Sequence, residues 1–215
     1  MNISIECLPA SGAEAARQVR QQVFGSEWRL SLPQVCEYHP GRQLTLVARD
    51  RSSQEPVAAL TVAETTGDAE VHGRVGLSFL KGERVARHTQ LAVLKPYRGL
   101  NLSIRLILEA QRRFVAPQNI RYTWLLFDAA RASGSLLCAL LGFHCGSAVI
   151  RAEHGPCRLL FRDELSVSAQ SGNRRGWAYL TALAESKSVP EVEPLFSRRL
   201  DATGRGESIS PPPAT

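Results

Sequence analysis

One stretch limits most strongly what this chain can fold into: an apolar run, a turn and the start of an amphipathic helix. The apolar run occupies residues 92–94, Pro96 ends it, and Gly99 marks the turn that follows. From Ile104 onward, apolar residues recur at helical spacing. The pattern predicts a strand, a tight turn and a helix over residues 102–115.

This turn is a candidate anion site. A helix that begins in a small-residue turn offers unpaired backbone N–H groups and the positive end of its dipole. Arg98 adds a cation beside those groups. The combination predicts phosphate binding, and the alternative is an ordinary turn between a strand and a helix.

Residues 93–99 resemble the fourth strand and pyrophosphate loop of the GNAT N-acyltransferases. The loop signature of that family is Arg or Gln, two residues, Gly, one residue, and then Gly or Ala. Arg98 and Gly99 agree with the family pattern, whereas Asn101 and Ser103 replace its small residues. Asn tolerates a left-handed backbone and Ser is small, so such a loop can still close on a pyrophosphate.

A second match lies at residues 132–143, which are similar to the GNAT helix that ends in Leu-Gly-Phe. The predicted order of elements is also that of the GNAT fold. Strands are expected at 3–8, 44–49, 57–63, 75–79, 84–94, 120–128, 148–150 and 158–161, and helices at 12–24, 102–115 and 133–141. The second and third of these strands are expected to form a hairpin across residues 50–56. The resemblance covers residues 1–165. It implies an α/β fold of GNAT type, whose mixed, mostly antiparallel central sheet is flanked by helices and splayed in the middle.

Two further segments, residues 20–24 and 154–158, are similar to N-acyl amino acid synthases and autoinducer synthases. Those relatives take long acyl chains, often from acyl carrier protein. This chain has Arg-His-Thr-Gln at residues 87–90, where they carry Glu-x-Ser-Arg. The implied co-substrate is acetyl-CoA or acyl-CoA, with acyl-acyl carrier protein as a second possibility, and the implied acceptor is an amine.

Acyl transfer to an amine needs an anchored donor, removal of an amine proton and a proton for the leaving thiolate. The resemblance assigns the donor's pantetheine arm to backbone amides of the strand and its pyrophosphate to the loop. The strand residues are Leu91, Ala92 and Val93, and the loop residues are Tyr97, Arg98, Gly99, Leu100, Asn101, Leu102 and Ser103.

Two residues are candidates for proton transfer. His88 is the nearest group that titrates near neutrality, although a hydrogen-bonded strand histidine is the alternative. Cys138 stands four residues before Gly142, where many relatives carry Tyr; its alternative is a buried cysteine that packs as a small hydrophobe. Tyr97, Tyr122 and Ser135 are other candidates for the acid.

Composition narrows the choice of partner. The chain has 215 residues, 44% of them hydrophobic, and a net charge of +6, which suits a globular protein with an anionic partner such as a phosphorylated cofactor or an acidic carrier protein. Its arginines are scattered, so nucleic-acid binding is not expected.

We expect no metal, because the neighbours His144 and Cys145 would point to opposite faces of a strand. Five unpatterned cysteines, no signal peptide and no membrane span indicate a cytoplasmic protein.

Composition shifts after Leu165. Residues 166–200 are expected to form a Ser/Gly-rich linker at 166–173 and a short helical extension at 176–187, and residues 201–215 a disordered tail.

The whole pattern predicts an N-acyltransferase. The alternative is a non-catalytic acyl-CoA sensor or a protein-interaction module, which the absence of the usual strand Glu and helix Tyr favours. The acceptor, the acyl chain length and the oligomeric state are not specified by the sequence.

Overall fold

A computed structural model describes residues 2–8, 14–29, 42–66, 83–128, 133–152 and 155–185. Its strands are β1 Ile3–Leu8, β2 Gln43–Asp50, β3 Pro56–Thr66, β4 Arg84–Val93, β5 Tyr122–Asp128, β6 His144–Ala152 and β7 Gly155–Asp163. Its α-helices are α1 Glu14–Arg20, α4 Leu102–Ala110, α5 Ser133–Leu141 and α6 Val167–Glu185. Three shorter segments complete them: the π-helical turns η2 Gln21–Glu27 and η5 Gln111–Val115, and the 3₁₀ turn η4 Lys95–Tyr97.

The seven strands form one sheet in the order β1-β2-β3-β4-β5-β7-β6. Every neighbouring pair is antiparallel except β4 and β5, which run parallel. The predicted fold class, a mixed and mostly antiparallel sheet flanked by helices, is therefore confirmed. So is the predicted hairpin of the second and third strands.

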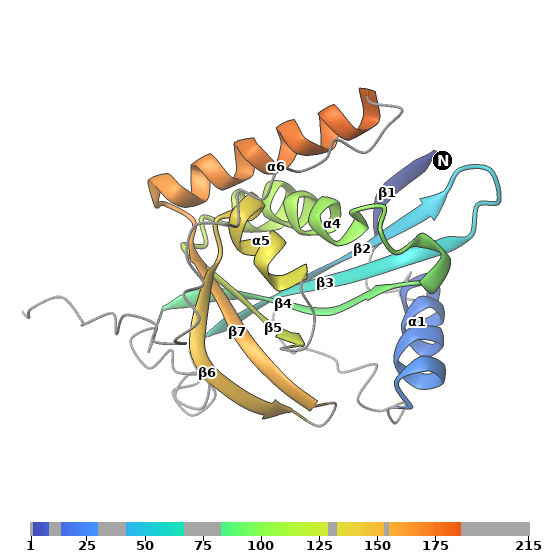
Figure 1. The fold of residues 1–215 in the computed structure, drawn as a ribbon, viewed down its shortest axis with the longest axis horizontal. Coiled ribbons are helices and arrows are strands. Elements are labelled where there is room, and N and C mark those ends of the chain that lie inside the picture. Colours follow the sequence, from blue (N-terminus) through green and yellow to red (C-terminus); the bar gives the residue numbers. More distant parts are fainter. Residues whose placement is uncertain are drawn as a thin grey trace, which may run out of the picture.

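The sheet opens where its two halves meet. β4 pairs with β5 over only three residues, the last pair being Arg87 with Trp124. Beyond this point β3 stays paired with β4 as far as Val93, and β7 stays paired with β5 as far as Asp128. β4 thus stays with β3, and β5 stays with β7, after the pairing between β4 and β5 has ended. The two halves of the sheet diverge from this point (Figure 1). One edge of β4 is thereby left without a strand partner among the described residues.

Helices cover both faces of the sheet. Figure 1 shows α4, α5 and α6 on one face and α1 on the other. Alternation along β2 explains the two layers: Leu46 and Ala48 join the core beneath α4, whereas Val47 joins the cluster beneath α1 and η2. We call these the α4 face and the α1 face. Apolar residues on both sides of the strands therefore hold the sheet in the centre of the fold.

A β-bulge interrupts β4. Thr61 pairs with Thr89 and Ala59 with Ala92, so β4 carries one residue more than β3 over this interval. Gln90 has a φ of 54° there, in the left-handed region. The extra residue reverses the alternation: Leu91 packs against the α4-face core, while Ala92 faces α1.

The expected linker at residues 166–173 is wrong, because α6 begins at Val167 and runs through it. The Oγ of Ser166 accepts a hydrogen bond from the N–H of Ala169 at 3.1 Å and so caps the helix. A Cβ at Gly172 would lie 2.5 Å from the backbone nitrogen of Gly142, and one at Gly176 would lie 2.8 Å from Leu141 Cδ2. The small residues that suggested a linker instead let α6 approach α5 closely.

A buried arginine joins α6 to the rest of the fold. Arg162 on β7 is fully buried, and its Nη1 donates to the carbonyl of Leu141 at 2.6 Å and to Asn173 Oδ1 at 2.9 Å. Its guanidinium is also paired with Glu164. It therefore satisfies a free carbonyl at the end of α5 and holds α6 in place.

Several predicted elements agree closely with the structure. The first strand and the helix at 133–141 have the expected bounds, and Gly142 ends that helix with a φ of 70°. The helix expected at 102–115 is α-helical to Ala110 and π-helical from there to Val115. The expected strand at 75–79 and tail at 201–215 lie outside the described residues. Within the described ranges, no helix is both long and apolar enough to cross a membrane.

Candidate functional site

The loop between β4 and α4 is held open by two left-handed residues. Gly99 has a φ of 90° and Asn101 a φ of 55°, values that glycine adopts without strain and asparagine tolerates. Among the described atoms, none lies within 4 Å of where a Cβ of Gly99 would be. Backbone conformation rather than crowding therefore requires glycine, and space beside the loop is open.

Helix α4 begins without a side-chain cap. Asn101 is its N-cap residue, yet the Asn101 side chain makes no capping hydrogen bond. The first helical bond runs from Arg105 N–H to the Asn101 carbonyl at 3.1 Å. The N–H groups of Leu102, Ser103 and Ile104 consequently have no acceptor within the helix. These donors and the helix dipole favour an anion at this end of α4.

The open edge of β4 leads directly to this loop. Leu94 N–H donates to the Val57 carbonyl of β3 at 3.0 Å. Since successive residues of a strand direct their backbone groups to opposite sides, those of Leu91 and Val93 point toward the side that β5 has left. An extended chain that carries amide groups can add to such an edge as a strand would.

Two predicted loop residues are engaged within the protein. The Nε of Arg98 donates to the Val93 carbonyl at 3.0 Å, and its Nη2 lies 2.5 Å from Glu27 Oε2 of η2. The hydroxyl of Tyr97 donates to Asp50 Oδ2 at 3.3 Å, which ties the loop to the end of β2. Glu27 has no signal in the sequence, because it lies 71 residues from its partner.

His88 lies on β4 just beyond the last pair with β5, and its ring centroid is 6.4 Å from that of Phe143. Its side chain is 4% exposed, and neither ring nitrogen has a hydrogen-bond partner among the described residues. Burial and the nearby Arg162 guanidinium lower the pKa of His88 to about 3. The imidazole is therefore neutral at pH 7, and as a base it would be a weak one.

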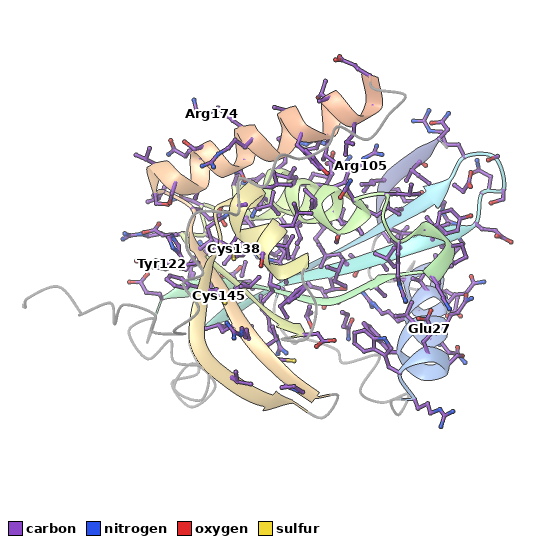
Figure 2. All side chains as sticks on the ribbon, in the orientation of Figure 1. Glu27, Arg105, Tyr122, Cys138, Cys145 and Arg174 are labelled. Atoms are coloured by element: carbon purple, nitrogen blue, oxygen red, sulfur yellow. The ribbon has the colours of Figure 1, made fainter. Side chains whose placement is uncertain are left out.

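Cys138 lies in the last turn of α5, half-buried against the α4-face core. Figure 2 labels it together with Cys145 of β6. Burial, followed by the influence of Cys145, raises the pKa of the Cys138 thiol to about 11. Because the thiol keeps its proton at pH 7, its protonation state suits a proton donor and not a nucleophile.

Arg87 and Thr89 occupy the region of β4 in which the resemblance expects a Glu base, and Arg87 lies on the opposite face of the sheet from His88. The guanidinium of Arg87 lies 5.0 Å from the ring centroid of Trp124. Trp124 belongs to an apolar cluster with Val85. His88 and Cys138 both lie on the α4 face. The structure thus brings the predicted strand and loop residues together at one end of β4, and it places Arg87 and His88 on opposite sides of the strand.

Among the described residues, no three His, Cys, Asp or Glu side chains gather closely enough to hold a metal ion.

No protein-family model matches this chain, and no curated protein matches it either. Solved structures do. FeeM, an N-acyl amino acid synthase from uncultured soil microbes, is 12% identical with a TM-score of 0.57 over 75% of this chain and 90% of FeeM. An acetyltransferase of the GNAT family from Staphylococcus aureus Mu50 is 14% identical with a TM-score of 0.51, over 75% and 99% of the two chains.

Arabidopsis thaliana NAA60, solved in complex with acetyl-CoA, is 16% identical with a TM-score of 0.52, over 75% of this chain and 98% of NAA60. At these identities the likeness concerns the fold. The structural neighbours are GNAT-family acetyltransferases and an N-acyl amino acid synthase, and this chain shares their fold.

Proposed function

We propose that this protein is an N-acyltransferase that moves an acetyl or longer acyl group from a CoA thioester to an amine. The observation that carries the proposal is the open edge of β4, which leads into the uncapped N-terminus of α4. The edge would pair with the amides of the pantetheine arm, and the helix N-terminus would hold the pyrophosphate.

The reaction follows from this placement of the donor. The amine nitrogen adds to the thioester carbonyl carbon, the C–S bond breaks, and the thiolate of CoA takes up a proton. The Leu91 N–H, which faces the open side of β4, would stabilise the oxyanion that develops on the carbonyl. The Cys138 thiol, protonated at pH 7, is the candidate donor to the thiolate and regains its proton from solvent. The acceptor reacts as the free amine and loses its proton to water.

The solved structures of the same fold support this choice of donor. NAA60 was crystallised with acetyl-CoA, and FeeM is an N-acyl amino acid synthase. We therefore name acetyl-CoA and longer acyl-CoA as co-substrates. An amino acid as acceptor is a narrower prediction that the assay below can test. Acyl-acyl carrier protein is the second candidate donor, and the same assay tests it when acyl-acyl carrier protein replaces acyl-CoA.

The test of the donor site is the substitution Ser103→Glu. A carboxylate at the second residue of α4 suits the helix dipole but repels a pyrophosphate bound there. We expect CoA affinity to fall at least about tenfold, which is about 1.4 kcal/mol, without loss of thermal stability. The matched control is Ser168→Glu, the same change at the second residue of α6. Isothermal titration calorimetry with CoA measures both, and equal affinities would place the donor elsewhere.

Catalysis is tested separately, with acetyl-CoA and longer acyl-CoA presented to a panel of amines, including amino acids. Release of free CoA that depends on the amine would support the transferase. Tight binding without transfer to any amine would instead support an acyl-CoA sensor, a reading favoured by Arg87 at the position where the resemblance expects Glu.

A further inference from the structure

Arg98 bridges two parts of the fold that donor binding would have to separate. One side of its guanidinium donates to the carbonyl of Val93, and the other is paired with the carboxylate of Glu27. The side chains of the pair are 34% and 26% exposed, so both can be reached from solvent. Figure 2 labels Glu27 on the blue helical segment near the loop that follows β4.

The first contact covers the open edge of β4. Leu94 directs its N–H toward β3, so the Val93 carbonyl points to the opposite side, which β5 has left. Val93 is the last residue of the strand, next to the loop. While Arg98 donates to this carbonyl, the end of the edge that an incoming amide chain would use is occupied.

The second contact leads to the other face of the sheet. Glu27 ends η2, whose residues Val23 and Phe24 pack with Ala92 on the α1 face. The free N–H groups of α4 belong to a helix that packs on the α4 face. The Arg98 guanidinium is therefore held toward η2 by a carboxylate, although it stands only four residues before the first residue of α4.

From this geometry we infer that Glu27 is an internal competitor of the donor: its carboxylate holds Arg98 in the free protein, and the donor's pyrophosphate takes its place. The inference rests on the proposed function, since it concerns the same donor site. Carboxylate and pyrophosphate are both anions that pair with guanidinium. Donor binding then releases the Val93 carbonyl and detaches η2 from the loop. Binding of CoA is in this way coupled to the helix on the α1 face.

The test is Glu27→Gln, which keeps the size of the side chain and removes its charge. An exposed ion pair contributes at most about 1 kcal/mol, which corresponds to a ratio of roughly fivefold between two Kd values. We therefore expect CoA to bind about threefold to fivefold more tightly to the variant. The matched control is Glu14→Gln, which breaks the exposed pair with Arg17 on the same helical segment. It should leave the affinity for CoA unchanged.

A double-mutant cycle with Arg98→Ala separates competition for Arg98 from general repulsion by a nearby negative charge. If Glu27 acts through Arg98, adding Glu27→Gln to Arg98→Ala changes the affinity less than twofold. Weaker or unchanged binding by Glu27→Gln alone would overturn the inference, and so would a full gain in the Arg98→Ala background. Absence of CoA binding by the unmodified protein would instead reject the proposed function itself.

Discussion

At the scale of single residues, several side chains of the candidate site have properties set by what packs around them. His88 has an ordinary pKa near neutrality as a free side chain, yet in the fold it is a buried, neutral group beside Phe143. Cys138 holds its proton more tightly than a free thiol. Arg98, the cation of the loop, is engaged with Glu27. For each of these predicted site residues, the chemistry is decided by its surroundings.

The low pKa of His88 predicts sensitivity to acid. The unfolded chain binds a proton at His88 below about pH 6.5, while the folded protein does so only near pH 3. The contribution of the neutral His88 imidazole to the free energy of unfolding is therefore fully present above about pH 6.5. It is lost as the pH falls toward 3, by at most about 1.4 kcal/mol per pH unit.

Urea denaturation at pH 7 and pH 5 measures the loss. His88→Leu should lose less stability than the unmodified protein over this range, because leucine cannot take up a proton. Other acid-sensitive groups, such as Glu64 and Asp163, whose pKa values are lowered chiefly by hydrogen bonds from Arg84 and Arg121, are present in both proteins. An identical pH dependence for the two proteins would contradict the buried neutral histidine.

At the scale of elements, α6 shows how glycine can serve packing. Gly172 and Gly176 lie four residues apart on one side of α6, where they face α5 and its C-terminal glycine, Gly142. Ser166 caps the helix, and Leu180 packs against the α4-face core. The helical extension expected from residue 176 is therefore the second half of a longer helix. Trp177, on the same helix, is 36% exposed.

Gly172→Ala should be strongly destabilising. The new Cβ would lie 2.5 Å from backbone atoms of Leu141 and Gly142, which cannot move aside cheaply. We expect a loss of about 2–3 kcal/mol or more in the free energy of unfolding, against a gain of up to about 1 kcal/mol in helix propensity. In Gly176→Ala the closest contact is the flexible end of Leu141, so the loss should be smaller. Urea denaturation ranks the two, and the reverse order would contradict this packing.

At the scale of the whole molecule, two half-sheets joined by three residue pairs create the candidate site. β1 to β4 form one half, and β5, β7 and β6 the other. The helices of the α4 face span both halves: α4 packs on β2, β3 and β4, whereas α5 leads into β6. α6 contacts both α4 and α5 on the side of these helices that faces away from the sheet (Figure 1).

Removal of α6 should therefore cost the protein its fold. A chain that stops after Ser166 leaves Arg162 without its contact to Asn173 and exposes the side of α5 that α6 covers. We expect this chain to lose its cooperative thermal transition. A chain that stops after Glu185 keeps every contact described above and should melt within a few degrees of the full chain. Cooperative melting of the shorter chain at an unchanged temperature would restore the interpretation of residues 166–173 as a linker.

The sequence by itself determined the elements whose signals are local. The run and turn before α4, the hairpin of β2 and β3, and the glycine that ends α5 depend on neighbouring residues, so periodicity and turn chemistry were enough to predict them. The anion site at the loop after β4 followed from the same turn chemistry, whereas the role of Leu91, Ala92 and Val93 followed from the resemblance to the GNAT family. These strand and loop residues lie together because they are consecutive in the chain.

Tertiary structure alone decided the contacts between distant residues. The partner of Arg98 lies 71 residues away in the sequence, and the pKa of His88 depends on its burial beside Phe143 and on the charge of Arg162. Gly172 could be distinguished from a linker glycine only once α5 lay against it. Packing and strand register are non-local, and a one-dimensional pattern carries no record of which surfaces will meet.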